Sequence, residues 1–267
     1  MTARTLATAA LLALLVPLMP SPGSAQGLRY GLTGDWVLLV DGKVSSGAEV
    51  FVAQRPPSLL LLVPEIPSPL RLGIATKEVE RLDLMGVGRP SDTQVELLAQ
   101  APLAREAPFQ LAGDEVVFRA AGREVRLKPR PWLIGEKNGR EVTEHDPTYG
   151  RKAAAYTPVA DVMARLREAK GKVEVLVFFG SWCPHCKDHV PYLIKVEEGI
   201  GKDSFRFRYH GLPNNFGELP EPRRYNVRAV PTAIVLVGGR EVGRIAANRW
   251  ASPESAIHDI LKAAGAV

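Results

Sequence analysis

The chain contains two cysteines, Cys183 and Cys186, and they follow a continuous apolar run closely. The run, Val173–Phe179, is interrupted only by Glu174, which is typical of a β-strand buried on both faces. Two cysteines placed at random would fall three positions apart about once in a hundred chains, so we interpret the pair as a unit. If a helix begins at Cys183, then Cys186 lies one turn later on the same side, close enough for a disulfide.

The start of a helix also favours a reactive thiolate at Cys183. Free N–H groups and the positive end of the helix dipole stabilise a negative charge there. Cys186, one turn deeper, is expected to stay protonated and to resolve a mixed disulfide. Pro184 and His185 lie between the cysteines and are expected to tune the thiolate. The sequence therefore predicts Cys183 and Cys186 as the catalytic residues of thiol–disulfide exchange.

Other roles of the cysteine pair stay open at this point. A stabilising disulfide gains most by closing a long loop, and this pair closes almost none. Zinc needs four ligands, and Cys183, Cys186 and His189 leave the set one short. A copper site completed by a distant histidine is conceivable. The alternative function is therefore a binding module, for copper or for a substrate, whereas an oxidoreductase of this kind needs no cofactor and no metal.

The residues around the pair resemble the active-site segment of the thioredoxin superfamily. The resemblance rests on Phe178-Phe179-Gly180-Ser181-Trp182-Cys183-Pro184-His185-Cys186-Lys187, on Pro191 and on Arg228-Ala229-Val230-Pro231-Thr232. It covers the range 173–264 and implies a thioredoxin-like α/β fold with a cis peptide bond before Pro231. It also implies that Val230, Pro231 and Thr232 bind substrate, with the backbone of Val230 pairing with the substrate chain. Trp182 is expected either to flank the substrate groove or to pack beneath the active site.

The details of the motif point to a subgroup. The Cys-Pro-His-Cys sequence is that of DsbA-type oxidants, but the stretch between Cys183 and Pro231 is too short for the large helical insertion of DsbA. The Ser181-Trp182 dipeptide and the size are more similar to thioredoxin or to the periplasmic TlpA-like proteins. One position departs from thioredoxin, because Val177 stands where that family has a buried acid. The resemblance implies exchange with protein thiols or disulfides and a redox partner, in a direction that the sequence leaves open.

The preceding part of the chain predicts a different kind of domain. Short apolar runs separated by Pro, Gly, Ser and Asp fill the range 26–135, a pattern typical of a small, mainly β barrel or sandwich. The range 136–157 is interpreted as a linker, and 158–267 as the thioredoxin-like domain with a helix over Pro158–Ala169. Trp132 and Trp250 are expected to be core anchors. The predicted strands of the β-rich range are Trp36–Val40, Val50–Ala53, Leu59–Val63, Leu70–Ile74, Leu82–Val87, Val95–Leu98, Glu115–Arg119 and Glu124–Lys128.

Composition excludes several classes of protein. Hydrophobic residues make up 46% of the 267 residues and charged residues 24%, the proportions of a chain that buries a core. A disordered chain, a collagen-like chain and a polytopic membrane protein are therefore excluded. The net charge of +5 comes from scattered basic residues without a run of five like charges, so we expect no nucleic-acid partner.

Residues 1–25 have the pattern of a secretory signal peptide. Arg4 supplies a positive start, Leu6–Met19 is a mostly apolar run, and Gly23-Ser24-Ala25 provides small residues before a cleavage point. The run of about 14 residues is short for a membrane-spanning helix, which needs about 20. We expect no stable membrane insertion after cleavage, and a periplasmic or secreted protein in a compartment where disulfides persist.

We predict that the exported protein begins at Gln26, after removal of the signal peptide behind Ala25. The intact mass of the exported material measures this directly. A mass that still includes Met1 would contradict the prediction.

Overall fold

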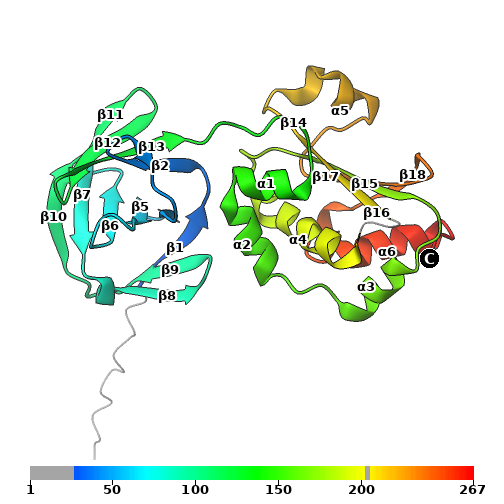
Figure 1. Cartoon of the computed structure of the whole chain (residues 1–267), viewed down its shortest axis with the longest axis horizontal. Coiled ribbons are helices and arrows are strands. Elements are labelled where there is room, and N and C mark those ends of the chain that lie inside the picture. The colour runs from blue at the N-terminus through cyan, green and yellow to red at the C-terminus, as the bar shows by residue number, and fades with distance from the viewer. Residues whose placement is uncertain (1–26, 202–204) are drawn as a thin grey trace, which may run out of the picture.

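The structure is a computed structural model, and it describes residues 27–201 and 205–267. The expected signal peptide lies outside the described residues. Figure 1 shows a strand-rich part, formed by β1 to β13, and an α/β part that contains the helices α1 to α6. No helix in the described ranges is both long and apolar enough to cross a membrane.

The strand-rich part consists of two antiparallel sheets. The order is β10-β7-β6-β5-β4-β1-β9-β8 in an eight-stranded sheet and β11-β12-β13-β2-β3 in a five-stranded one. The strands are β1 (Leu28–Thr33), β2 (Trp36–Val40), β3 (Lys43–Val44), β4 (Glu49–Gln54), β5 (Pro57–Leu62), β6 (Leu70–Gly73), β7 (Glu78–Leu82), β8 (Val87–Ser91), β9 (Gln94–Leu97), β10 (Leu103–Pro108), β11 (Gln110–Ala112), β12 (Glu115–Ala120) and β13 (Arg123–Pro129).

The larger sheet carries apolar side chains on both faces. Val50 and Leu61 belong to a core shared with Leu127 of the smaller sheet, whereas Phe51 and Leu60 belong to a second core. Successive side chains of a strand point to opposite faces, so β4 and β5 supply both cores. The burial of both faces accounts for the nearly continuous apolar sequences of β4 and β5. The strand-rich part as a whole has the shape of a half-barrel.

One predicted strand of this part is wrong. Leu82 ends β7 and Val87 begins β8, and the 3₁₀ helix η1 (Leu84–Gly86) lies between them. The side chain of Asp83 accepts a hydrogen bond from the backbone N–H of Met85 at 2.9 Å. Such local side-chain capping favours a turn over a continuous strand.

The α/β part is built on a five-stranded sheet of order β14-β16-β15-β17-β18. The central strand β15 runs parallel to β16 and antiparallel to β17. The strands are β14 (Gly135–Lys137), β15 (Val173–Phe179), β16 (Phe205–Gly211), β17 (Thr232–Val237) and β18 (Arg240–Arg244). The helices are α1 (Gly139–His145), α2 (Pro147–Ala155), α3 (Ala160–Arg167), α4 (Pro184–Ile200), α5 (Pro220–Arg224) and α6 (Pro253–Ala263), with 3₁₀ helices η2 (Phe216–Glu218) and η3 (Ala247–Arg249).

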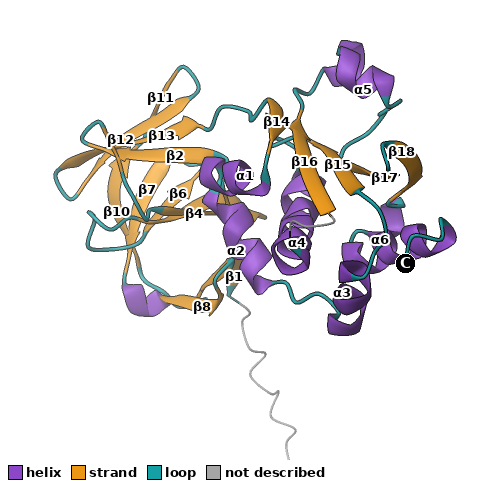
Figure 2. Ribbon diagram, turned by 45° about the vertical axis from the view of Figure 1, so that its right-hand side comes forward, coloured by secondary structure: helices purple, strands orange, loops and turns teal. Residues whose placement is uncertain are grey.

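Both faces of this sheet are covered, as Figure 2 shows, with α4 and α6 on one side and α5 on the other. Val175 and Val177 of β15 pack in the core that includes side chains of α2, α3, α4 and α6. Leu176 and Phe178 pack on the opposite face, with Val227 and other residues near α5. Strand β15 is therefore buried on both faces and has the bounds that the sequence predicts.

The range expected to be a linker, 136–157, contains α1 and α2 instead. Helix α1 begins with a capping box, in which the side chains of Asn138 and Glu141 each accept the other's backbone N–H. Helix α2 begins after Asp146, whose carboxylate caps its first turn. These caps, together with packing of α2 against α4, order a segment whose polar composition is also typical of loops.

We predict that Leu176→Ala lowers the free energy of unfolding by about 2 to 5 kcal/mol, because it leaves a cavity beside the central strand. Leu176 is fully buried, at 0% exposure, whereas Leu111 is 62% exposed. Urea unfolding followed by circular dichroism measures the change. Leu111→Ala is the control, and an equal loss in both variants would contradict this description of the core.

Candidate active site

The two cysteines lie at the start of α4, close behind the end of the central strand. Cys183 is the N-cap residue, and Pro184 occupies the first helical position, where a missing N–H is tolerated. Cys186 is fully buried and its sulfur accepts a hydrogen bond from the backbone N–H of Gly180 at 3.4 Å. Neither cysteine forms a disulfide, and both are buried.

The surroundings of Cys183 favour its thiolate. The neighbouring Cys186 thiol, the backbone N–H groups of Cys186 and His185, and the charge of His185 lower the pKa of Cys183 from its ordinary value of 9.0 to about 6, against the opposing effect of burial. A thiol with this pKa is mostly ionised at neutral pH, and the thiolate is the nucleophilic form.

Cys186 is in the opposite situation. Burial raises the pKa of its thiol strongly, and the neighbouring Cys183 adds to the effect. Cys186 therefore keeps its proton while Cys183 is ionised. Two like groups whose environments move their pKa values apart have different roles in a reaction.

The loop before β17 lies beside Cys183. The Cys183 sulfur is 3.7 Å from the carbonyl oxygen of Val230, to which its thiol form donates. The Val230–Pro231 peptide bond is cis. The hydroxyl of Thr232 donates a hydrogen bond to the carbonyl oxygen of Ala229 at 2.8 Å, and this internal contact stabilises the loop. The structure thus places the expected substrate-binding loop next to the thiolate.

Trp182 packs over the turn that precedes the cysteines. Its indole N–H donates to the carbonyl oxygen of Leu212 at 2.8 Å. A side chain at Gly180 would meet the Trp182 ring at 2.5 Å, so the turn needs a glycine. The ring also lies 6.4 Å, between centroids, from that of Trp132.

The expectation that Trp132 is a core anchor is wrong, because its exposed fraction is 46%, whereas Trp250 is buried at 4%. The segment around Trp132 is held by its backbone rather than by burial of the indole. The N–H of Leu133 donates to the hydroxyl of Ser181 at 2.9 Å, and β14, which follows, pairs with β16. Trp132 is therefore fixed beside the active-site turn and remains partly open to solvent.

Two further residues near the thiols carry no local sequence signal. Lys187, next to Cys186, forms an ion pair with Asp35 of the turn between β1 and β2. Tyr149 of α2 packs edge-on against Phe179, at 6.4 Å between centroids, and its buried hydroxyl has no hydrogen-bond partner. Burial raises the pKa of Tyr149 well above 10, so its hydroxyl stays protonated.

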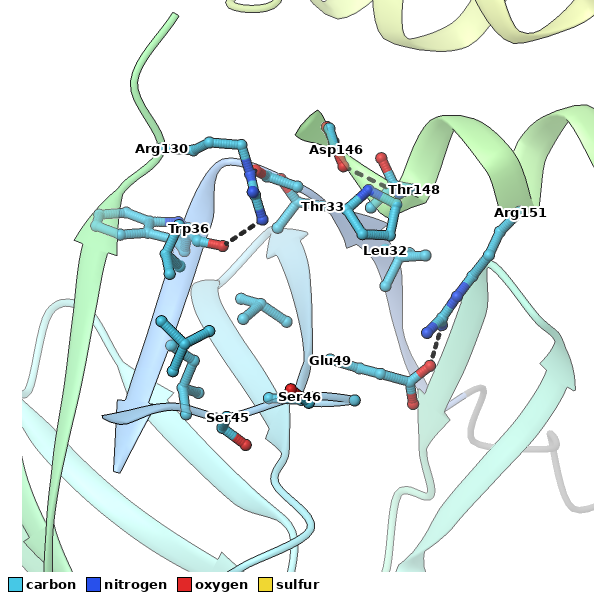
Figure 3. Close-up of a pocket in the computed structure, with 18 of the residues that line it drawn as sticks. Leu32, Thr33, Trp36, Ser45, Ser46, Glu49, Arg130, Asp146, Thr148 and Arg151 are labelled. Atoms are coloured by element: carbon cyan, nitrogen blue, oxygen red, sulfur yellow. Dashed lines mark hydrogen bonds and ion pairs between the residues drawn. The ribbon is translucent and has the colours of Figure 1, made fainter. Parts of the chain in front are cut away.

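The boundary between the two parts of the chain is held by Arg130. Its guanidinium donates to the carbonyl oxygens of Gly34 at 2.7 Å, His145 at 2.6 Å and Trp36 at 3.2 Å. Figure 3 shows this contact to Trp36 at a pocket of about 230 Å³, on whose other side Arg151 of α2 forms an ion pair with Glu49 of β4. The strand-rich part and the active-site part therefore share a polar interface.

The described part of the chain holds no group of three or more His, Cys, Asp or Glu residues placed to bind a metal ion.

No protein-family profile matches this chain. Protein disulfide-isomerase A5 of Mus musculus is 24% identical over 151 residues, which is 57% of this chain and 26% of that protein. The chain thus spans about a quarter of the length of this relative. This weak similarity supports a relationship to the thioredoxin-like superfamily and an oxidoreductase-like fold.

Solved structures similar to this chain include two thioredoxins. The thioredoxin of Fasciola hepatica is 25% identical, with 39% of this chain and 91% of that chain covered and a TM-score of 0.28. A thioredoxin variant from Halobacterium salinarum is 16% identical, with 40% and 87% covered and a TM-score of 0.24.

We predict that the alkylation rate of Cys183 by iodoacetamide follows a titration with a midpoint near pH 6, because its pKa is lowered to about 6. The thiolate persists as the pH falls from 9 and is lost below this midpoint. His185→Pro should move the midpoint upward, since it removes both the backbone N–H of residue 185 and the imidazole charge, each of which favours the thiolate.

Cys183→Ser is the control for this measurement. It should show no alkylation between pH 5 and pH 8, because the remaining thiol is buried and protonated. A midpoint that His185→Pro leaves in place would contradict the tuning role of His185.

Proposed function

We propose that this chain is an exported thiol–disulfide oxidoreductase that exchanges disulfides with protein substrates through Cys183 and Cys186. The observation that carries the proposal is the contrast between two thiols one helical turn apart. One has a lowered pKa and lies at the helix start, and the other has a raised pKa and is buried. Such opposed shifts are characteristic of groups with chemical roles.

The reaction proceeds in two exchange steps. The Cys183 thiolate attacks one sulfur of a substrate disulfide, the substrate S–S bond breaks, and the leaving sulfur takes up a proton. Cys186 then loses its proton and attacks the Cys183 sulfur of the mixed disulfide, which releases the second substrate thiol. Two electrons pass to the substrate, and Cys183 and Cys186 are left as a disulfide. A dithiol partner restores the thiols, and the same steps in reverse oxidise a dithiol substrate.

Other residues orient the substrate and tune the thiolate. Pro184 and His185 shape the first turn of α4 around Cys183. Val230 offers its backbone to an extended substrate chain beside the thiolate, as an added strand does in other peptide complexes. Trp182, Pro231 and Thr232 are the other residues that we propose to contact the substrate.

The proposed site of action is the periplasm or the exterior of the cell, in agreement with the signal-like pattern of residues 1–25 and with a redox-active cysteine pair. Within the superfamily, the features of Ser181-Trp182 and of the Cys-Pro-His-Cys motif favour a thioredoxin-like or TlpA-like protein with a tuned potential. Because thiolate stabilisation raises the potential, we expect a reduction potential between about −270 mV and about −120 mV, the values of thioredoxin and DsbA.

We predict that the wild-type protein equilibrates with glutathione buffers, and that Cys186→Ala accumulates a mixed disulfide through Cys183. Without the second thiol, the intermediate has no internal route to resolution. Intact-mass analysis after acid quenching detects the adduct, and metal content is measured on the same sample. Cys183→Ser is the control and should form none.

A metal-loaded protein whose thiols do not exchange with glutathione would overturn the proposal in favour of a binding module.

A further inference from the structure

A recess lies at the boundary of the two parts of the chain, next to the turn that leads into Cys183. Its volume is about 220 Å³, and the residues that line it include Trp36, Trp132 and Trp182. Three of the four tryptophans in the sequence therefore meet at this place. Trp36 comes from β2 of the strand-rich part, Trp132 from the connecting segment, and Trp182 from the active-site turn.

The polar groups in the lining already have partners. Arg130 donates to three backbone carbonyls, and Asp35 is paired with Lys187. The carboxylate of Asp146 accepts the N–H of Thr148 at 2.9 Å. His145 is the exception, since its buried Nε2 has no partner, and burial lowers the pKa of its ring, which makes the neutral form dominant at neutral pH. The three tryptophans, together with Pro129 and Pro131, supply the apolar side chains of the lining.

The size of the recess limits that occupant. Its volume of about 220 Å³ corresponds to about seven water molecules at about 30 Å³ each. Sites for drug-sized ligands are larger, from about 300 to 1,000 Å³. A single large side chain matches the space, and indole walls favour an aromatic or aliphatic one because aromatic pairs gain energy beyond their buried area.

The position of the recess identifies where this side chain comes from. Trp182 immediately precedes Cys183, and the Trp132 ring is 6.4 Å from the Trp182 ring. An extended chain advances about 3.3 to 3.6 Å per residue. A polypeptide joined to Cys183 by a mixed disulfide therefore brings residues within a few positions of its own cysteine over the two indoles.

We propose that this recess is a specificity pocket, which takes an apolar, preferably aromatic, side chain located near the reacting cysteine of a polypeptide substrate. The inference rests on the proposed function and adds a substrate preference to it. Trp132 is the specificity-determining residue, since it is partly exposed at 46%, and the backbone N–H of the next residue, Leu133, is anchored to Ser181 in the turn before Cys183. The strand-rich part contributes Trp36 and thereby a wall of the pocket.

The test uses disulfide-linked peptides on the full exported chain. One series carries a single phenylalanine at each position from three before to three after the cysteine, and the reference peptide has alanine at all of them. We expect one or two neighbouring positions at which phenylalanine raises kcat/KM about tenfold, the effect of burying much of one aromatic side chain. Trp132→Ala should abolish this preference, and Trp132→Phe should retain most of it.

Ile134→Ala is the matched control, because Ile134 is 47% exposed in the same segment and does not line the recess. It should leave the phenylalanine preference unchanged. Exchange of the wild type with glutathione disulfide, which carries no aromatic or large aliphatic side chain for the recess, measures the redox activity independently of the pocket.

The outcomes separate the two proposals. Absence of exchange between the wild type and glutathione overturns the proposed function itself. Normal glutathione exchange with no phenylalanine preference, or with a preference that survives in Trp132→Ala, overturns the specificity pocket alone.

Discussion

The burial of β15 on both faces is the constraint on which the candidate active site depends. Its residues from Val175 to Phe179 are all 0% exposed, and the strand is hydrogen-bonded along both edges. The chain therefore leaves the sheet at a fixed point, turns at Gly180 and begins α4 at Cys183. Because the helix starts against the core, Cys186 is carried inward and Cys183 stays at the rim. The difference between the two thiols follows from this placement.

Much of this site is predictable from the sequence because its signals are local. The bounds of β15, the helix start at Cys183 and the loop at Val230 all follow from short patterns of residues. The polar composition of the range 136–157 does not distinguish short capped helices from a linker, because helix caps and polar loops use the same residue types. The exposure of Trp132 and the partner of Lys187 depend on residues that are distant in sequence, and no periodicity reports such contacts.

The two parts of the chain contribute different residues to the proposed site. The thiols and the groups that tune them lie in α4 and the turn before it, whereas two walls of the proposed pocket come from Trp36 and the connecting segment. Substrate preference can therefore change through substitutions that leave Cys183 and its hydrogen-bond donors in place. No sequence pattern indicates a role for the strand-rich part. In the proposed pocket, it contributes to substrate binding through Trp36.

The contacts of Arg130 have a consequence for how this boundary tolerates sequence change. All three of its acceptors are backbone carbonyls, which every residue possesses. Substitution at Trp36 or His145 leaves the acceptor in place, whereas Gly34 has no space for a side chain beside Asp146. At this contact, therefore, only the arginine and the glycine have fixed identities. The ion pairs of Arg151 with Glu49 and of Lys187 with Asp35, by contrast, need a specific residue on both sides of the boundary.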